Sequence, residues 1–426
     1  MNAREQGFRT DLAFARELDA VDPLAPLRDE FIVPTGPDGS PLRYFCGNSL
    51  GLMPRRAVEY VQAEMETWAR EAVDGHHRKD APWYTYHEQF RGPLARLAGA
   101  KEHEIVLMNS LTVNLHLLMV SFFRPEPVRR KILIEAPCFP SDLYAVKTHL
   151  GHHGLDPREA LVQVGPRPGE ATLREEDIEA AIAREGAKLA LVLLGGVNFL
   201  TGQRLDLARI ARAAKQAGAR VGFDLAHGMG NVPLALHDSG ADFAVWCSYK
   251  YLNAGPGAVA GAYVHESNVR DLSLPRFGGW WGNDPRTRFR MQLEPDFVPV
   301  PSADGWQVSN PPILAMAPLR ASLELFDRAG MPALRAKSVR LTSYLHDLLV
   351  LEAGHHVAVI TPEDPERRGC QLSLRLREGA LSAQKSLAGR GFTVDFREPD
   401  ILRVAPTPFY NTFHDAWLLA RALSGR

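Results

Sequence analysis

The segment DFAVWCSYKYLNAGPGAVAG, residues 242–261, joins a run of apolar side chains to a turn rich in glycine and asparagine. Its first part is typical of a strand in a sheet that is covered on both faces. At the end of that strand stands Lys250, whose amine is costly to take out of water unless a partner uses it. Two interpretations follow from this segment alone: an ammonium group that extends to the solvent, or an amine that binds a ligand.

The chain around this segment alternates short apolar runs with helical patterns. We predict four strands, and a fifth of unassigned direction, at residues 131–136, 189–194, 220–226, 242–249 and 257–265. Helices are predicted at residues 174–186 and 205–218, where apolar side chains recur at helical spacing and each segment ends at a glycine. This alternation predicts an α/β fold with a mainly parallel sheet flanked by helices.

The pattern changes after the double proline at residues 311–312. A long helical stretch follows, then strands with period-2 alternation at 371–377 and 401–406 and a last helix near 412–424. We therefore expect a smaller C-terminal α+β domain. The predicted parts are an N-terminal segment that packs with the small domain (1–45), a large domain that holds the ligand (46–310) and the small domain itself (311–426).

The composition narrows the possible partners. Lys+Arg 49 against Asp+Glu 50 leaves a net charge of −1, so charge gives no reason to expect a nucleic acid or an anionic membrane. No apolar run approaches the ~20 residues that span a bilayer, and residues 1–20 lack the apolar core of a signal peptide. Four cysteines occur without a C-x-x-C pair, which is typical of reduced thiols, and we expect a cytoplasmic protein.

An acid and an imidazole precede Lys250 in the motif DLAHGMGN. Asp224 and His227 lie where the strand predicted at 220–226 ends, and ligands of open α/β sheets bind at that carboxyl edge. Pyridoxal phosphate requires a lysine that forms an imine with its aldehyde and an acid that keeps its pyridine nitrogen protonated. Nucleotide sites are disfavoured, because no G-x-x-x-x-G-K-[ST] occurs and GPGAVAG has the wrong glycine spacing. The sequence therefore favours a pyridoxal phosphate site.

A phosphate site is predicted in the segment MNSLTVNLHLLMVSFF, residues 108–123. Ser110 and Thr112 stand just before an apolar helical run, and the N-terminus of a helix binds phosphate. The same two residues could instead cap the helix, and both roles remain open.

Seven motifs, taken in order, resemble kynureninase, a hydrolase among the fold-type-I pyridoxal phosphate enzymes. They are NSLTVNLH, CFPSD, GFDLAHGMGNV, WCSYKYLNAGPG, GGWWG, VSNPPI and LRVAPTPFYNTF, and the resemblance extends from about residue 44 to about residue 415. The resemblance implies a fold-type-I, transferase-like fold of the class V aminotransferase-like superfamily. It also implies that the large domain binds pyridoxal phosphate and that two subunits form a homodimer with shared active sites.

The resemblance assigns cofactor contacts motif by motif. Lys250 is implied as the Schiff-base lysine, Asp224 as the partner of the pyridine nitrogen and His227 as the neighbour of the ring hydroxyl. The other implied contacts are the ring cover Phe139, its neighbours Pro140, Ser141 and Asp142, the phosphate ligands Leu111, Thr112 and Tyr249, and two residues that the neighbouring subunit can supply, Trp280 and Asn310.

For the substrate the resemblance implies a cleavage at the Cβ–Cγ bond. Hydrolysis of L-kynurenine would give anthranilate and L-alanine, and hydrolysis of 3-hydroxy-L-kynurenine would give 3-hydroxyanthranilate and L-alanine. The resemblance places this reaction in the kynurenine pathway of tryptophan catabolism, which also serves NAD biosynthesis. Arg403 would bind the substrate carboxylate through two hydrogen bonds, with His76 and Asn310 as further contacts. Lys250 would remove the Cα proton and Tyr249 would carry protons, as general acid–base groups do.

The chain departs from the family pattern at two positions. Gly195 stands where serine or threonine is common, which removes one side-chain contact near the cofactor. Asn283 stands where relatives can have histidine, which concerns the preference for ring substituents.

Other interpretations stay open beside this one. A cysteine desulfurase or an aminotransferase would share the fold and the cofactor, and Cys370 is the candidate for a desulfurase's mobile cysteine, although its place before a predicted strand favours a structural role. A pseudoenzyme would need none of Lys250, Asp224 and Arg403. No metal site is predicted: histidines such as His149 and His153 are interpreted as solvated loop residues, because nearby glycines argue against a helix.

Overall fold

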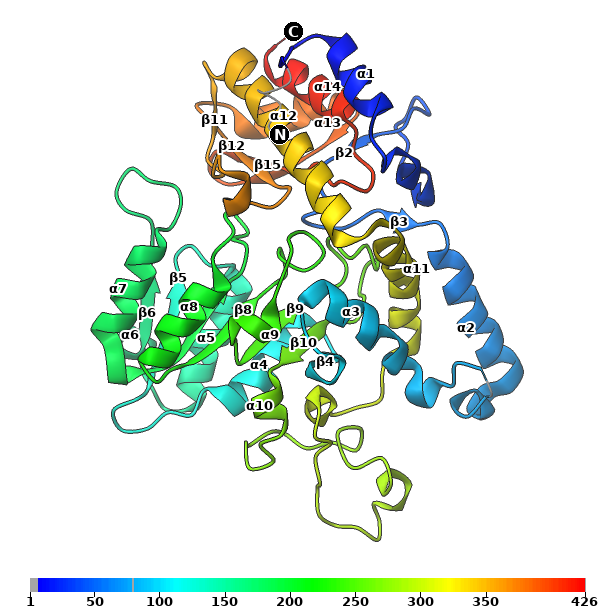
Figure 1. Ribbon diagram of the computed structural model, residues 1–426, viewed down its shortest axis with the longest axis vertical. Coiled ribbons are helices and arrows are strands. Elements are labelled where there is room, and N and C mark those ends of the chain that lie inside the picture. The colour runs from blue at the N-terminus through cyan, green and yellow to red at the C-terminus, as the bar shows by residue number, and fades with distance from the viewer. Residues whose placement is uncertain (1–6, 79, 426) are drawn as a thin grey trace.

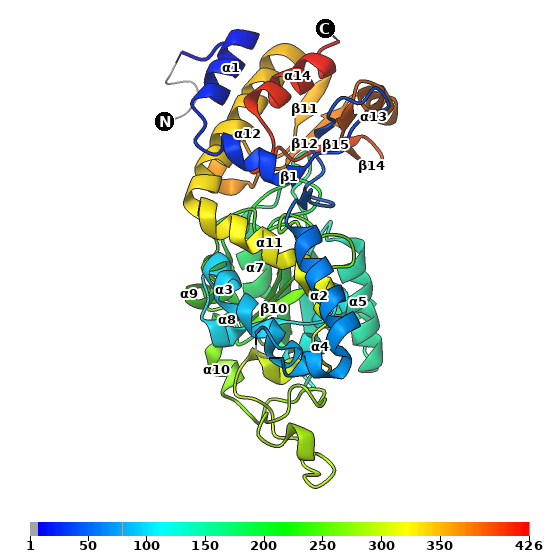
Figure 2. The same cartoon turned by 90° about the vertical axis from the view of Figure 1, so that its right-hand side faces the viewer.

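The structure is a computed structural model that describes residues 7–78 and 80–425. Its elements form two units (Figure 1). The larger unit is built on a mainly parallel sheet, and the smaller unit carries the first and last helices, α1 (Leu12–Ala20) and α14 (Phe413–Leu423), which pack side by side (Figure 2). The remaining helices are α2 Ala57–Glu71, α3 Arg91–Ala98, α4 Leu111–Phe122, α5 Pro140–His152, α6 Pro157–Ala160, α7 Glu175–Glu185, α8 Leu207–Gln216, α9 Leu236–Ser239, α10 Glu266–Val269, α11 Ile313–Ala329, α12 Met331–Ala353 and α13 Ala380–Gly389.

The larger sheet has seven strands among the described residues, in the order β4-β10-β9-β8-β7-β5-β6. Their bounds are β4 Ile105–Leu107, β5 Lys131–Glu135, β6 Leu161–Val164, β7 Leu189–Gly195, β8 Arg220–Asp224, β9 Phe243–Trp246 and β10 Gly261–Val264. Strands β9, β8, β7, β5 and β6 pair in parallel, whereas β10 is antiparallel to both of its neighbours. The prediction of an α/β fold with a mainly parallel sheet is confirmed. The predicted strand of unassigned direction is β10, which is antiparallel to both of its neighbours.

Helices cover both faces of this sheet (Figure 2). In β5, Ile132 and Ile134 pack into the core shared with α4 and α5, whereas Leu133 packs into the core shared with α7 and α8. Because successive side chains of a strand point to opposite faces, a strand covered on both faces has an uninterrupted apolar run. These uninterrupted apolar runs are why the strands of the larger sheet could be predicted from the sequence.

The smaller unit has a four-stranded antiparallel sheet, in the order β11-β12-β15-β14, within the part of the chain that the structure describes. Its strands are β11 Val357–Val359, β12 Leu372–Leu376, β14 Asp395–Arg397 and β15 Ile401–Val404. Short pairings join distant segments: β1 (Phe31–Ile32) with β3 (Met53–Pro54), and β2 (Arg43–Tyr44) with β13 (Phe392–Thr393). The N-terminal side chains Phe14, Leu18 and Phe45 belong to the core of this unit.

The connection between the two units passes through α11 and α12. Met316, Leu319 and Leu323 of α11 pack in the core of the larger unit, beside α2, whereas Leu341 and Leu348 of α12 pack in the core of the smaller one. The predicted domain boundaries, with the small domain beginning at residue 311, remain predictions. The first helix after that boundary, α11, packs in the core of the larger unit.

Strand β9 ends earlier than the sequence indicated. It stops at Trp246, and residues 247–250 form a turn that carries Lys250 away from the sheet. Opposite Trp246, a Cβ atom at Gly261 would lie 2.3 Å from the indole ring, so only glycine leaves room for this tryptophan. The turn places Lys250 above the carboxyl ends of the parallel strands.

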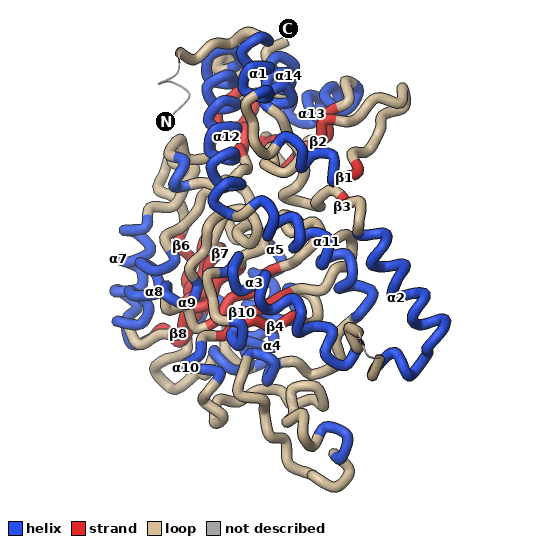
Figure 3. Tube along the Cα trace, turned by 45° about the vertical axis from the view of Figure 1, so that its right-hand side comes forward, coloured by secondary structure: helices blue, strands red, loops and turns tan. Residues whose placement is uncertain are grey.

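A long loop region separates α10 from α11. It contains the short 3₁₀ helices η7 (Arg288–Arg290) and η8 (Ala303–Trp306), and it extends from the end of the larger unit that is remote from the smaller one (Figure 3). In the described residues, every helix is too short or too polar to cross a lipid bilayer.

Candidate active site

A small cavity opens at the carboxyl edge of the larger sheet. Most of the predicted cofactor contacts line it: Leu111, Thr112, Phe139, Asp142, Asp224, His227, Tyr249 and Lys250. Glu135, Gly195, Val197, Phe199 and Ala226 complete the lining. The sequence therefore identified the larger part of this cavity.

Lys250 and His227 meet inside the cavity. Nζ of Lys250 lies 3.0 Å from Nε2 of His227, and both side chains are buried. Burial, together with the charge of Lys250, lowers the pKa of His227 well below its usual range, so the imidazole is neutral. A neutral imidazole that accepts at Nε2 carries its proton on Nδ1, and this Nδ1 has no hydrogen-bond partner in the described part of the chain.

Two aspartates, Asp142 and Asp224, line the cavity. Asp224, at the end of β8, accepts a hydrogen bond of 2.7 Å from the backbone N–H of Ala226. Burial and the nearby charge of Asp224 raise the pKa of Asp142 well above its usual range. Oδ1 of Asp142 has no hydrogen-bond partner among the described residues.

Glu135 is a third carboxyl group in this region, and sequence reasoning missed it. Both of its carboxylate oxygens lie 3.0 Å from the backbone nitrogen of Gly195, which donates to them. Burial raises the pKa of Glu135 to about 7, against the Gly195 hydrogen bond that lowers it. The reasoning that identified Asp224 could also have identified Glu135, because Glu135 is an acid at the end of the apolar run KILIEA.

The opposite side of the cavity is formed by the N-terminus of α4. Leu111 and Thr112, in its first turn, line the cavity, and no acidic residue occupies that turn. Ser110 is the N-cap residue, but its side chain makes no capping hydrogen bond, so the alternative role of helix cap is not observed for it. Oγ1 of Thr112 lies 3.0 Å from Oγ of Ser141, and free N–H groups at a helix N-terminus favour an anion.

Aromatic side chains form the wall beside Lys250. The Phe139 ring centroid lies 5.7 Å from Nζ of Lys250, and the ring meets Phe199 edge-on at 5.4 Å. Phe139 is the N-cap residue of α5, and Pro140 is that helix's first residue, where proline is favoured. Pro140 and Ser141 do not line the cavity, but they begin the helix that positions Asp142.

The donors and acceptors of the cavity fit pyridoxal phosphate. This cofactor has an aldehyde, an anionic phosphate and a basic ring nitrogen. The cavity offers a lysine amine, the N-terminus of α4 and the carboxyl groups of Asp142 and Asp224, while Nδ1 of His227 and Oδ1 of Asp142 lack partners in the residues that are described.

Arg403 lies just behind the cavity wall. Its Nε and Nη2 donate to the Asp395 carboxylate, across the pair of strands β14 and β15, and its Nη1 donates to the carbonyl oxygen of Phe199 at 2.7 Å. Burial lowers the pKa of Arg403, and the Asp395 charge counteracts this. Of five guanidinium N–H groups, two are left for a second carboxylate.

Trp280, Asn310 and His76 do not line the cavity of their own chain. Ring contacts connect His76 to His77, His77 to Phe289 and Phe289 to Trp280, over centroid distances of 6.1 to 6.5 Å. Asn310 is exposed at the end of the same loop region. These three predicted contacts therefore lie outside the cavity of their own chain.

The structure shows which groups surround the two residues that depart from the family pattern, Gly195 and Asn283. Gly195 donates its N–H to Glu135, so a carboxyl group lies beside the position where the family resemblance implied a side chain. Asn283 is buried, and its Oδ1 accepts from the backbone N–H of Val298 at 2.8 Å, which fixes the loop between these residues.

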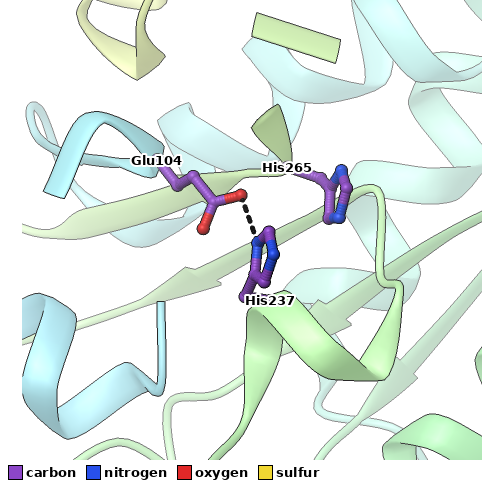
Figure 4. A group of neighbouring side chains, drawn as sticks. All are labelled: Glu104, His237 and His265. Carbon is purple, nitrogen blue, oxygen red and sulfur yellow. Dashed lines mark hydrogen bonds and ion pairs between the residues drawn. The ribbon is translucent and has the colours of Figure 1, made fainter. Parts of the chain in front are cut away.

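One group of potential metal ligands lies outside the cavity. Glu104, His237 and His265 place ligand atoms within 4.8 Å of one another (Figure 4). The two imidazole rings are stacked, with 5.1 Å between centroids and 3° between planes. A metal lies in the plane of the imidazole that binds it, at about 2.0–2.1 Å, and parallel rings do not direct their nitrogens to one point. The Glu104 carboxylate already accepts from His237 and from the backbone N–H groups of Lys101 and Glu266.

The interpretation of these histidines as solvated loop residues is wrong for His149, and His152 lies in the same helix. Helix α5 continues through Gly151 to His152, and His149 is buried against Phe123, at a centroid distance of 5.7 Å. Glycine lowers helix propensity by only about 1 kcal/mol, and packing of α5 against α4 outweighs this.

Cys370 lacks the properties of a desulfurase's mobile cysteine. It is fully buried beside Tyr251 and Ala405, and burial raises the pKa of its thiol to about 12. A neutral thiol without access to the cavity does not act as a nucleophile.

Comparisons with known proteins agree with this geometry. The family "Kynureninase C-terminal domain" matches residues 334–423. The chain is 56% identical over 418 residues to the kynureninase of Myxococcus xanthus, covering 98% of each chain. It is 52% identical over 426 residues to that of Salinispora tropica, covering 99% of this chain and 98% of the relative.

Solved structures resemble the chain in fold. The cysteine desulfurase CsdA from Escherichia coli superposes with a TM-score of 0.75 at 19% identity, covering 94% of this chain and 97% of that one. A C-DES structure with glycine covalently linked to its PLP cofactor superposes with a TM-score of 0.74 at 19% identity, covering 93% and 98%. The fold is therefore that of fold-type-I pyridoxal phosphate enzymes.

Proposed function

The chain belongs to the kynureninase family, and from this premise we propose how its residues carry out the reaction. The reaction is the pyridoxal-phosphate-dependent hydrolysis of the Cβ–Cγ bond of L-kynurenine or its 3-hydroxy form, which releases anthranilate or 3-hydroxyanthranilate and L-alanine. The convergence of Lys250, His227 and Asp224 in one cavity is the observation that best supports the residue roles.

The residues of the cavity hold the cofactor in one orientation. Asp224 would face the ring nitrogen, the first turn of α4 with Thr112 and Tyr249 would bind the phosphate, and Phe139 would cover the ring. Lys250 supplies the amine for the aldehyde carbon. When bound, pyridoxal phosphate is an electron sink for negative charge at the substrate Cα.

Proton transfers are carried out by Lys250 and Tyr249. The free amine of Lys250 would take the proton from the substrate Cα. His227 stays neutral and accepts from Nζ, so it orients this amine without adding a charge. Burial raises the pKa of Tyr249, and its phenol therefore keeps a proton that it can donate to the departing carbon.

Arg403 binds the substrate carboxylate. Asp395 and the Phe199 carbonyl fix the plane of the guanidinium group, and two N–H groups remain for the carboxylate. Phe199 also lines the cavity, so this carboxylate is held beside the cofactor. A rigid guanidinium fork matches a carboxylate better than a lysine does.

The active unit that we propose is a homodimer. Trp280, Asn310 and His76 lie outside the cavity of their own chain, which supports the proposal that they contribute to the site of a second subunit. An apolar groove along α2 supports such an association, because Met53, Val58, Met65 and Leu314 expose apolar side chains there.

We place the reaction in tryptophan catabolism by the kynurenine pathway, with a product that serves NAD biosynthesis. A reducing compartment such as the cytoplasm suits the chain, because Cys46, Cys138, Cys247 and Cys370 are all free and buried.

The decisive experiment measures anthranilate release by the purified, cofactor-loaded protein, with L-kynurenine and 3-hydroxy-L-kynurenine in parallel. Turnover of either substrate is expected, and the ratio of the two kcat/KM values identifies the preferred one. If neither substrate yields an anthranilate while the bound cofactor still absorbs visible light, the chain is a different enzyme of the same fold, such as a desulfurase or an aminotransferase.

A further inference from the structure

We propose that Glu135 is a positioning residue of the cofactor site, whose carboxyl group changes its protonation when the cofactor binds and thereby couples cofactor affinity to pH. The inference rests on the proposed function, in which Asp224 faces the ring nitrogen of pyridoxal phosphate. It concerns a residue that no motif of the sequence assigned to the site.

The position of Glu135 follows from the order of the strands. Strands β5, β7 and β8 are adjacent, and they end at Glu135, Gly195 and Asp224 respectively. Gly195 and Asp224 are paired across β7 and β8, and Gly195 donates its N–H to Glu135. All three residues line the cavity, so the Glu135 carboxyl stands two strands away from the acid that faces the ring nitrogen.

Gly195 makes this arrangement possible. A Cβ atom at position 195 would lie 2.8 Å from Oε1 of Glu135, closer than two such atoms approach in proteins. The absence of a side chain lets both carboxylate oxygens reach the backbone N–H at 3.0 Å. The departure of Gly195 from the family pattern thus leaves room for a hydrogen bond that favours the ionised form of Glu135.

The groups around Glu135 oppose that ionised form. Asp224 of β8 raises the pKa of Glu135, and Glu135 in turn raises the pKa values of Asp142, in α5, and of Cys138, just before α5. Lys250, in the turn after β9, faces Asp142 and His227. Burial, with a smaller contribution from the charge of Asp224, raises the pKa of Glu135 to about 7, where a modest change in local charge alters its protonation.

Binding of the cofactor supplies such a change. With the cofactor bound, a protonated ring nitrogen held by Asp224 would add positive charge near Glu135 and would lower the pKa of Glu135. By linkage, the cofactor then binds more tightly to the ionised form. Affinity falls as the pH drops below about 7, by up to tenfold per pH unit, because binding must first remove one proton.

The test is a titration of the apo full-length protein with pyridoxal phosphate at pH 6 and pH 8, followed by visible absorbance. The wild type should lose about tenfold more affinity between pH 8 and pH 6 than Glu135→Gln, which keeps the size of the side chain and an acceptor for Gly195. Glu104→Gln is the matched control, because Glu104 is also a buried glutamate that accepts backbone N–H bonds, outside the cavity. It should retain the pH dependence of the wild type.

Equal pH dependence of the wild type and Glu135→Gln overturns the inference but leaves the proposed function intact. Failure of the wild type to bind the cofactor at any pH would instead contradict the proposed function. A second variant, Gly195→Ala, tests the role of Glu135 independently, so the inference can be tested even if Glu135→Gln does not fold. Its Cβ displaces the carboxyl from the N–H donor, so the midpoint of the pH dependence should move to higher pH, and an unchanged midpoint also overturns the inference.

Discussion

Nζ of Lys250 lies 3.0 Å from Nε2 of His227, so the partner of this buried amine is a neutral imidazole. The two residues come from turns that follow neighbouring parallel strands, β9 and β8. A carboxylate in the place of His227 would hold the amine as an ammonium ion, which cannot form an imine. An imidazole fixes the position of the amine at a lower electrostatic cost, and burial of His227 ensures that it adds no charge of its own.

Replacement of Lys250 tests the centre of the site. Lys250→Ala should abolish the visible absorbance of the cofactor–lysine imine and reduce turnover by at least ~10³-fold, since it removes both the covalent anchor and the base at Cα. Absorbance spectra and single-turnover assays provide the measurement. Circular dichroism should show an unchanged fold, and a variant that retained a tenth of the wild-type rate would refute the role of Lys250.

The sequence predicted most of the strand ends that form this site, for a physical reason. Strands buried on both faces have continuous apolar runs, and a charged residue that follows such a run, as Asp224 does, stands out. Glu135 carries the same signal, but its role depends on the N–H of Gly195, which is 60 residues away in sequence and adjacent only through strand order.

Other features depend on tertiary packing and could not be predicted locally. β9 ends at Trp246 because the chain turns there toward the cavity, although the apolar run continues to Tyr249. Helix α5 continues through Gly151 because it packs on α4. α11 follows a proline pair that is typical of a boundary, yet its apolar face packs on the core of the larger unit.

Arg403 allows a test that separates binding of the substrate from binding of the cofactor. Arg403→Lys cannot satisfy Asp395, the Phe199 carbonyl and a substrate carboxylate at the same time. We expect kcat/KM to fall about 10- to 100-fold, mainly through KM, because hydrogen bonds to a charged group contribute about 1.5–3 kcal/mol.

The control for Arg403→Lys is Arg397→Lys. Arg397 also contacts Asp395, at 3.0 Å, but its side chain is 38% exposed and it should change kcat/KM only slightly. Cofactor absorbance should stay at the wild-type level in both variants. If Arg403→Lys lowered kcat without raising KM, the assignment of Arg403 to the substrate carboxylate would be wrong.

Shared active sites make a quantitative prediction for mixed dimers. Lys250→Ala and Asn310→Ala each inactivate or impair their own homodimers, but a dimer with one subunit of each kind has one site with an intact Lys250 and an intact Asn310. Random mixing after subunit exchange should restore about one quarter of the wild-type activity, since half of the dimers are mixed and each has one working site. Without restoration, Asn310 serves the site of its own chain and the proposed sharing is wrong.

Acid stability should depend on His149, the buried histidine of α5. Burial and the neighbouring histidines lower its pKa from 6.5 to about 4, so the stability that it contributes is present above pH 6.5 and is lost as the pH falls toward 4. The full shift corresponds to about 3 kcal/mol, which we discount to about 2 kcal/mol because the end of the helix is open to water. Between pH 7 and pH 4, the unfolding free energy of the wild type should therefore fall by about 2 kcal/mol more than that of His149→Gln. Urea denaturation at the two pH values measures this difference. His152 is exposed, so His152→Gln is the control, and its unfolding free energy should change with pH as that of the wild type does. If the unfolding free energies of His149→Gln and the wild type differ by the same amount at all pH values, His149 is not the group that titrates.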